Sequence, residues 1–162
     1  AMNIDVKGFT DEFYRKITGG RLQPVLDTVS IAKELGIHVE LTYLIIPTLN
    51  DDENEIRNFS RWARETLGED GIVHFSRFHP DYLLINLPET PVKTMHRAYE
   101  IAREEGLNYV YLGNLWEERY ETTYCPKCGA PLIKRSGYHV RMENIRQDGR
   151  CSRCGTKIPL VM

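Results

Sequence analysis

The hydrophobic positions of this chain follow two alternating patterns between residues 4 and 112. Four short runs are rich in apolar and β-branched residues, as is typical of buried strands: residues 4–6, 37–46, 72–78 and 109–112. Between them apolar residues recur at helical spacing over residues 11–17, 25–35, 56–67 and 92–102, and a glycine follows within four residues of the end of each segment. The order β-α-α-β-α-β-α-β predicts an α/β fold with a parallel sheet and right-handed crossovers.

The loops that follow the four expected strands hold most of the unusual residues, in "KGF", "IPTLND", "RFHPDY" and "GNLWEE". Ligands of parallel α/β folds bind at the carboxyl ends of the strands. Asp5 and Lys7 are two positions apart on a strand and therefore share one face, where their opposite charges suit a zwitterionic ligand. His79, directly after the third strand, and Tyr43, inside the second, are further candidates for this face. The alternative is that Asp5 and Lys7 form an ion pair with no ligand.

All four cysteines lie near the end of the chain, in the motifs "CPKCG" and "CSRCG". Each CxxC motif directs two thiolates at one ion, and two such motifs complete a closed, structural site. The spacing predicts a structural zinc ion bound by Cys125, Cys128, Cys151 and Cys154. Iron in a rubredoxin-like site is the alternative metal, and a pair of redox-active motifs is the alternative without metal. We therefore expect an α/β domain over residues 1–120 and a small zinc ribbon over residues 121–162.

The net charge of −2 conceals an asymmetry. Residues 124–162 carry eight Lys or Arg against two Asp or Glu, which leaves thirteen basic and twenty-one acidic residues in 1–123. An anionic partner explains such a tail, but so does attraction between the two parts or the negative charge of four zinc-bound thiolates. We favour the latter two explanations, so nucleic acid is not expected as a partner. No apolar run approaches the length of a membrane span and no signal peptide is visible, which predicts a cytoplasmic protein.

Five segments taken together resemble one family: "NIDVKGF", "LTYLIIPTLND", "HFSRFHPDY", "YVYLGN" and "TYCPKCG…GRCSRCG". In this order they are similar to the latter part of the AmmeMemoRadiSam-system radical SAM proteins, relatives of pyruvate formate-lyase activating enzymes. The resemblance implies that Asp5 and Lys7, as a DxK motif on a barrel strand, touch S-adenosylmethionine, and that His79 lines the same cofactor. Tyr43 is carried over by position alone, because some relatives have an arginine there.

The resemblance also implies what this sequence lacks. The family's CxxxCxxC loop, which holds a [4Fe–4S] cluster, is absent, as is the glycine-rich segment that binds methionine. We therefore expect a partial parallel (β/α) barrel, the carboxyl-terminal half of a radical SAM barrel that begins in mid-sheet and is inactive alone. S-adenosylmethionine and the cluster then belong to the intact oxidoreductase.

The expected partners are the missing amino-terminal half of the barrel or a second copy of this chain, and the substrate stays unknown. The alternative function is a binding module. In that case the zinc ribbon docks nucleic acid or a protein, and the α/β part serves as its scaffold.

Overall fold

The computed structural model describes residues 1–137 and 139–160. The chain divides into two compact units, Ala1–Leu115 and Trp116–Met162, which we call the sheet unit and the cysteine unit. The boundary that the sequence places at residue 120 stays a prediction.

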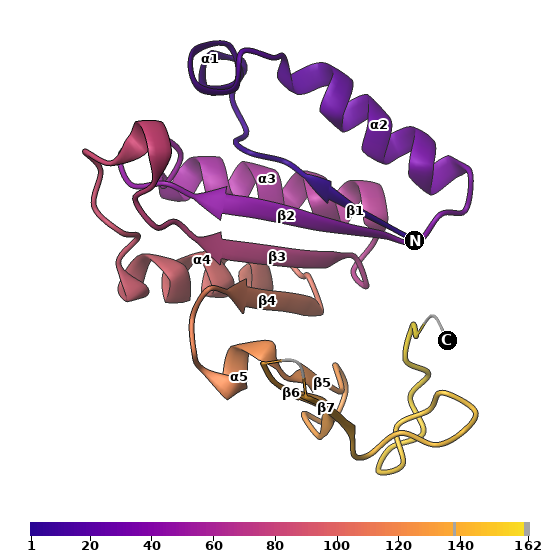
Figure 1. Ribbon diagram of the computed structural model, residues 1–162. Coiled ribbons are helices and arrows are strands. Elements are labelled where there is room, and N and C mark those ends of the chain that lie inside the picture. Colours follow the sequence, from indigo (N-terminus) through magenta and orange to yellow (C-terminus); the bar gives the residue numbers. More distant parts are fainter. Residues whose placement is uncertain (138, 161–162) are drawn as a thin grey trace. The chain divides into compact units, whose positions relative to one another are not determined.

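Four parallel strands form the sheet unit's single sheet, in the order β1-β2-β3-β4 (Figure 1): β1 (Met2–Asp5), β2 (Val39–Ile45), β3 (Ile72–Arg77) and β4 (Tyr109–Gly113). Their register aligns Asp5 with Thr42, Thr42 with His74, and His74 with Tyr111. One row of side chains therefore crosses all four strands. The predicted α/β fold with a parallel sheet is confirmed.

The connections between the strands are largely helical. In chain order they contain α1 (Asp11–Phe13), the π-helical turn η1 (Tyr14–Thr18), α2 (Leu22–Glu34), α3 (Glu53–Leu67), the short 3-10 turn η2 (Tyr82–Leu84) and α4 (Val92–Glu104). α3 begins at Asp52, whose carboxylate accepts hydrogen bonds from the Asn54 and Glu55 N–H groups, as a helix N-cap should. The loop after β3 contains η2, at whose start the Asp81 side chain accepts a hydrogen bond from the Tyr82 N–H.

The core of the sheet unit lies between the sheet and the helices α3 and α4, which are behind the sheet in Figure 1. Phe59 of α3 has its ring centroid 4.8 Å from that of Tyr43 and 6.0 Å from that of Phe75. Along β2 the odd-numbered residues are buried and the even-numbered ones are half-exposed. The sheet thus has a face covered by helices and an opposite face, which we call the open face.

The cysteine unit is small and built on an antiparallel sheet in the order β5-β6-β7 (Figure 1). Its elements are α5 (Glu118–Glu121), β5 (Thr123–Tyr124), β6 (Pro131–Ser136) and β7 (His139–Met142). The strands fall within the segment between the two CxxC motifs and just before it, as the sequence predicts for a ribbon. Across the described residues of both units, no helix is long and apolar enough to cross a membrane.

Candidate functional site

Asp5 and Lys7 lie together where β1 ends. Lys7 Nζ is 2.8 Å from Asp5 Oδ2, and the side chains are 44% and 49% exposed for Lys7 and Asp5. Ile4 and Val6, which alternate with them, are buried on the covered face. The pair is therefore on the open face, at the carboxyl edge of the sheet, and both charges are accessible to a ligand.

The backbone of Lys7 is held on both sides by buried side chains. Its N–H donates to the Tyr14 hydroxyl at 3.0 Å, and its carbonyl accepts from Asn50 Nδ2 at 2.7 Å. The same Asn50 amide donates to the Leu44 carbonyl at 2.9 Å, and its oxygen accepts from the Ile46 N–H at 2.6 Å. Asn50 is 1% exposed and joins the ends of β1 and β2, so it fixes where Lys7 sits. The sequence pattern alone does not mark Asn50 as part of this site, because its partners are defined only by the fold.

Tyr43 does not share the open face with Asp5 and Lys7. Its side chain is fully buried under α3, and its hydroxyl donates to Glu55 Oε1 at 2.8 Å and to the Asn50 carbonyl at 3.0 Å. Burial, and then the Glu55 carboxylate, raise the pKa of Tyr43, so that the phenol stays protonated. Tyr43 supports the loop that holds Lys7, and we do not include it in the ligand-facing set.

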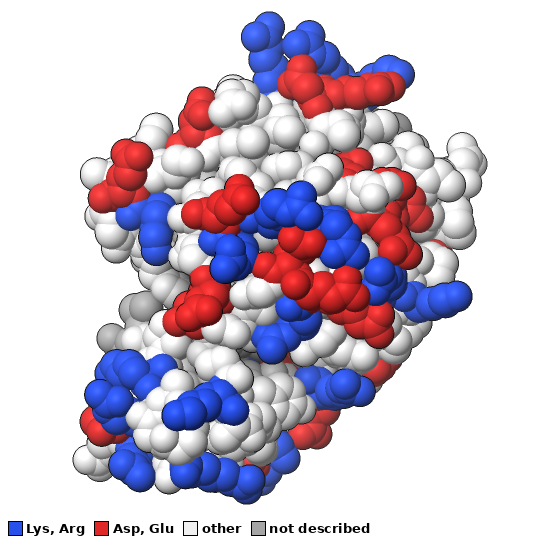
Figure 2. All heavy atoms as spheres, turned by 180° about the vertical axis from the view of Figure 1, so that it is seen from behind, with Lys and Arg blue, Asp and Glu red and all other residues white. Residues whose placement is uncertain are grey.

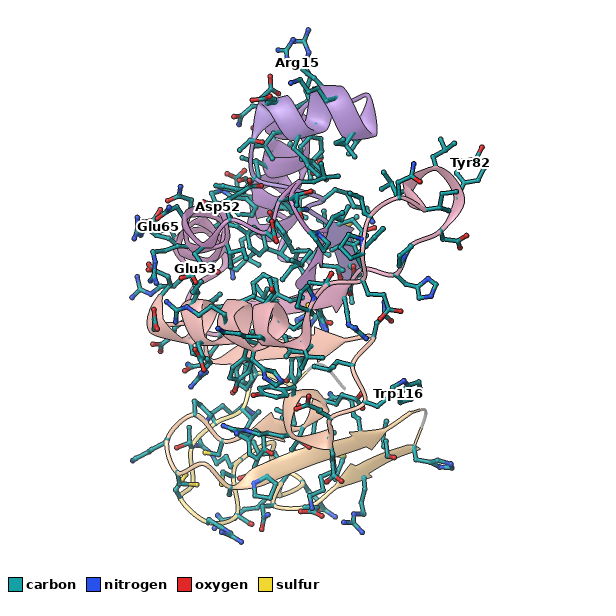
Figure 3. All side chains as sticks on the ribbon, turned by 90° about the vertical axis from the view of Figure 1, so that its left-hand side faces the viewer. Arg15, Asp52, Glu53, Glu65, Tyr82 and Trp116 are labelled. Carbon is teal, nitrogen blue, oxygen red and sulfur yellow. The ribbon has the colours of Figure 1, made fainter. Side chains whose placement is uncertain are left out.

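His79 follows β3 at the same edge of the sheet, two strands away from β1. Its side chain is 75% exposed, and Nε2 is 3.7 Å from Glu89 Oε1. After His79 the chain continues into η2, which begins at Tyr82. Tyr82 points away from Asp52, Glu53 and Glu65, which lie at α3 (Figure 3). His79 is thus largely exposed at the carboxyl edge of the sheet, near Glu89.

Glu40, His74 and His38 form a second group of polar side chains on the open face. Glu40 Oε2 is 2.8 Å from His74 Nε2, and Glu40 Oε1 is 3.3 Å from His38 Nε2. The His74 ring stacks on Tyr111 with centroids 5.2 Å apart. The hydrogen bond with His74, supported by His38, lowers the pKa of Glu40 to about 2 although the carboxylate is half-buried. The open face is therefore polar along the row from Asp5 to Tyr111, whereas Leu44 on the same face packs against a buried apolar cluster nearer the carboxyl edge.

The four cysteines converge in the cysteine unit. Their sulfur atoms all lie within 4.8 Å of one another, with Cys125 to Cys154 at 3.5 Å and Cys128 to Cys151 at 3.7 Å. Sulfur ligands of a tetrahedral ion with bonds of about 2.3 Å stand about 3.8 Å apart, whereas a disulfide needs about 2.05 Å. The geometry is thus compatible with a zinc ribbon.

The local backbone explains why the cysteines converge. In each motif the glycine N–H donates to the carbonyl of the first cysteine at 2.9 Å, from Gly129 to Cys125 and from Gly155 to Cys151. Gly129 and Gly155 have φ angles of 68° and 75°, a left-handed conformation that favours glycine. Both CxxC motifs, which we call the knuckles, therefore make the same tight turn. Each turn brings the two sulfur atoms of its own motif close together.

The cysteine set also limits what the chain can hold. An iron–sulfur cluster of the [4Fe–4S] type requires thiolate ligands, and the chain has only these four cysteines, all directed at one another. The residues present therefore do not fit such a cluster next to Asp5 and Lys7.

Comparison with known proteins finds a family match for the first part of this chain. Residues 1–60 match the model of the Radical SAM superfamily, and this segment holds Asp5, Lys7 and Asn50. Over its whole length the chain is 47% identical to an uncharacterised protein of Methanocaldococcus jannaschii, of which it covers 49%. It is 24% identical over 85% of its length to the GTP 3',8-cyclase of Lactiplantibacillus plantarum, of which it covers 46%. The chain thus spans about half the length of these curated relatives.

Among solved structures, the fold is similar to a domain of pyruvate-formate lyase-activating enzyme from Bacteroides vulgatus. The TM-score is 0.61 at 14% sequence identity, over 69% of this chain and 66% of that one. At this identity the similarity concerns the fold alone.

Proposed function

We propose that this chain is the carboxyl-terminal part of a radical SAM protein of the AmmeMemoRadiSam-system type and forms part of the wall that binds S-adenosylmethionine. The observation that carries the proposal is the position of the Asp5–Lys7 pair. The pair lies within the segment that matches the superfamily, at the carboxyl edge of a parallel sheet, with both charges accessible. Ligands of such sheets bind at that edge.

The chemistry of the pair suits the methionyl end of the cofactor, which carries an ammonium and a carboxylate. Asp5 would accept from the ammonium, and Lys7 would donate to the carboxylate, so that one internal ion pair is exchanged for two charge-assisted contacts. His79, exposed at the same edge, would line the cofactor from the side of β3. The bound cofactor would supply the radical chemistry, while these residues bind and orient it.

The electron source must then come from elsewhere. The four cysteines are gathered in the cysteine unit, where we assign them to a structural zinc ion. A cluster-bearing half of the barrel would complete the site. A second copy of this chain would cover the open face but would bring no cysteines for a cluster. The named relatives differ in what their names say they act on, so the substrate is not inherited from them.

The proposal predicts that this chain has no radical chemistry alone. After anaerobic incubation with iron and sulfide, the chain should show no [4Fe–4S] absorption, and dithionite should release no 5'-deoxyadenosine from S-adenosylmethionine. Adding the part of the Methanocaldococcus jannaschii relative that this chain does not cover should restore cofactor binding. Deoxyadenosine formed by the chain alone, above a control without protein, would overturn the proposal.

A further inference from the structure

Several arginines of α3 and α4 are paired with glutamates, whereas most of the described cations around the two CxxC motifs are not. On α3 and α4, Arg57 lies 2.7 Å from Glu105 and 2.8 Å from Glu104, and Arg97 lies 3.0 Å from Glu104. Figure 2 shows the result, with red and blue interleaved over this helical surface, whereas blue predominates on the cysteine unit. Two surfaces of one chain therefore differ in net charge although both are rich in arginine.

Five exposed cations surround the two knuckles: Lys127, Arg146, Arg150, Arg153 and Lys157. We call them the knuckle cations. Arg146 donates to the Ser152 carbonyl at 3.2 Å, Arg150 to the Gly155 carbonyl at 3.0 Å, and Lys157 to the Asp148 carbonyl at 2.9 Å. A backbone carbonyl holds a cation in place without cancelling its charge, so these side chains are oriented in advance and remain positive.

Carboxylates contribute little to balance this charge. Among the described residues, only Asp148 pairs with a knuckle cation, at 3.8 Å from Arg150. Residues 124–162 have eight Lys or Arg and two Asp or Glu. Four thiolates on a divalent ion carry two negative charges. This leaves four positive charges in excess in residues 124–162, and two in the whole cysteine unit, because residues 116–123 add Glu117, Glu118 and Glu121 against Arg119. The thiolates alone therefore do not account for the basic tail, contrary to part of the explanation that the sequence favours.

The strand β7 adds apolar side chains to the same small unit. All four of its residues are exposed, and Val140 and Met142 are 63% and 55% exposed. Next to it is a hollow of about 240 Å³, whose walls combine cationic, polar and apolar groups: Glu118, Lys134, Arg135, Ser136, His139, Val140 and Arg141. A chain of 47 residues folds to a radius of gyration of only about 10 Å, so a short extended ligand reaches both the hollow and the knuckle cations.

We propose that the cysteine unit binds single-stranded nucleic acid. The knuckle cations contact the phosphates, with three arginines whose planar forks match phosphate oxygens. The exposed side chains of β7 and the adjacent hollow contact the bases, which a single strand presents and a duplex conceals. An acidic peptide would satisfy the charge but would not require exposed apolar side chains beside it. The proposal is independent of the cofactor site on the sheet unit.

The test is fluorescence anisotropy of a labelled 12-nucleotide single-stranded RNA with the metal-loaded full chain, between 50 and 300 mM NaCl. Contacts to about five phosphates predict a slope of log K against log salt of about −3.5, because each contact to a single strand contributes about −0.7. The variant Lys127→Gln/Arg153→Gln removes two side chains that make no contact with a carboxylate in the described part of the chain. It should weaken binding about tenfold at 100 mM salt and flatten the slope by about 1.4.

Matched variants separate the parts of the proposal. Arg15→Gln/Lys16→Gln removes the same charge from exposed side chains of the sheet unit and should change neither affinity nor slope. Val140→Ser/Met142→Ser should weaken binding at least about fivefold with the slope unchanged, because apolar contact between these side chains and the bases releases no counterions. Metal content near one ion per chain in every variant verifies that the ribbon stays folded.

Four results would contradict the proposal. The first is no binding of RNA at 50 mM salt, and the second is an equal loss in the Arg15/Lys16 control. The third is displacement of the RNA by oligoglutamate at equal charge concentration, which would identify the surface as one for acidic proteins. The fourth is duplex DNA bound as tightly as the single strand, because β7 then contacts no bases.

Discussion

Replacing Cys151 with serine is expected to release the bound metal and unfold the cysteine unit. Cys151 is fully buried, and its sulfur is 3.7 Å from that of Cys128. The unit has 47 residues, and a hydrophobic core of that size rarely supplies more than about 3–5 kcal/mol. Structural zinc contributes about 10–16 kcal/mol in small peptides that fold around it, so the loss of one ligand exceeds what the core can offset.

Metal analysis and hydrogen exchange of the backbone amides would measure both effects. The wild-type chain should hold about one metal ion and protect the amides of β6, whereas Cys151→Ser should do neither. Ser152→Ala, at the exposed neighbouring position, is the matched control and should behave as the wild type. A Cys151→Ser chain that keeps its metal, or a metal-free wild type with a protected β6, would contradict the structural role of the ion.

Replacing Asn50 with alanine is expected to destabilise the sheet unit by about 3 kcal/mol or more. The change leaves the Lys7 and Leu44 carbonyls and the Ile46 N–H without the partner that Asn50 provides. Each buried backbone group left unsatisfied costs about 1–3 kcal/mol. Urea unfolding followed by tryptophan fluorescence measures the change, since the ring centroid of Trp62 in α3 lies 6.2 Å from that of Phe59 in the core.

The control for this prediction is Asn58→Ala, at an exposed position of α3. It should change stability by no more than about 0.5 kcal/mol, because surface substitutions of this kind touch no buried group. Equal effects of the two substitutions would show that Asn50 does not anchor the ends of β1 and β2.

The elements that depend on local chemistry were predictable from the sequence. The repeated glycine after each CxxC motif specifies the turn, and two such turns are sufficient to gather four sulfur atoms. Likewise, Ile56, Phe59, Ala63 and Leu67 recur at helical spacing and are all buried in α3. Periodicity of this kind needs no information from the rest of the chain.

The position of Tyr43 was not predicted, although the sequence contains a signal for it. Glu40 and Thr42 are polar and alternate with Leu41 and Tyr43, which places Tyr43 on the apolar face of the strand. Taken as a whole, the apolar run of residues 37–46 favours a buried strand and hides this alternation. The contact between Glu40 and His74 joins β2 to β3, so it follows only from the register of the two strands.

Contacts between distant parts of the chain could not be predicted from spacing. Asn50 bonds to Lys7, 43 positions earlier, and Glu55 bonds to the Phe9 N–H at 2.6 Å. Such pairs exist only once the strands have taken their register. Ion pairs around the knuckles cannot be predicted from composition either. The sequence shows the number of carboxylates but not which cations they contact.

The most direct test of cofactor binding at the Asp5–Lys7 face is the dissociation constant of S-adenosylmethionine for the completed barrel. Calorimetric titration would use this chain assembled with the part of the Methanocaldococcus jannaschii relative that it does not cover, with and without Asp5→Asn/Lys7→Met. Loss of one or two charged hydrogen bonds, at about 1.5–3 kcal/mol each, predicts an affinity at least about tenfold lower for the variant. Arg15→Gln/Lys16→Gln should bind as the wild type does. An unchanged affinity in the Asp5/Lys7 variant, or a wild-type assembly that binds no S-adenosylmethionine, would contradict the assignment of this face to the cofactor.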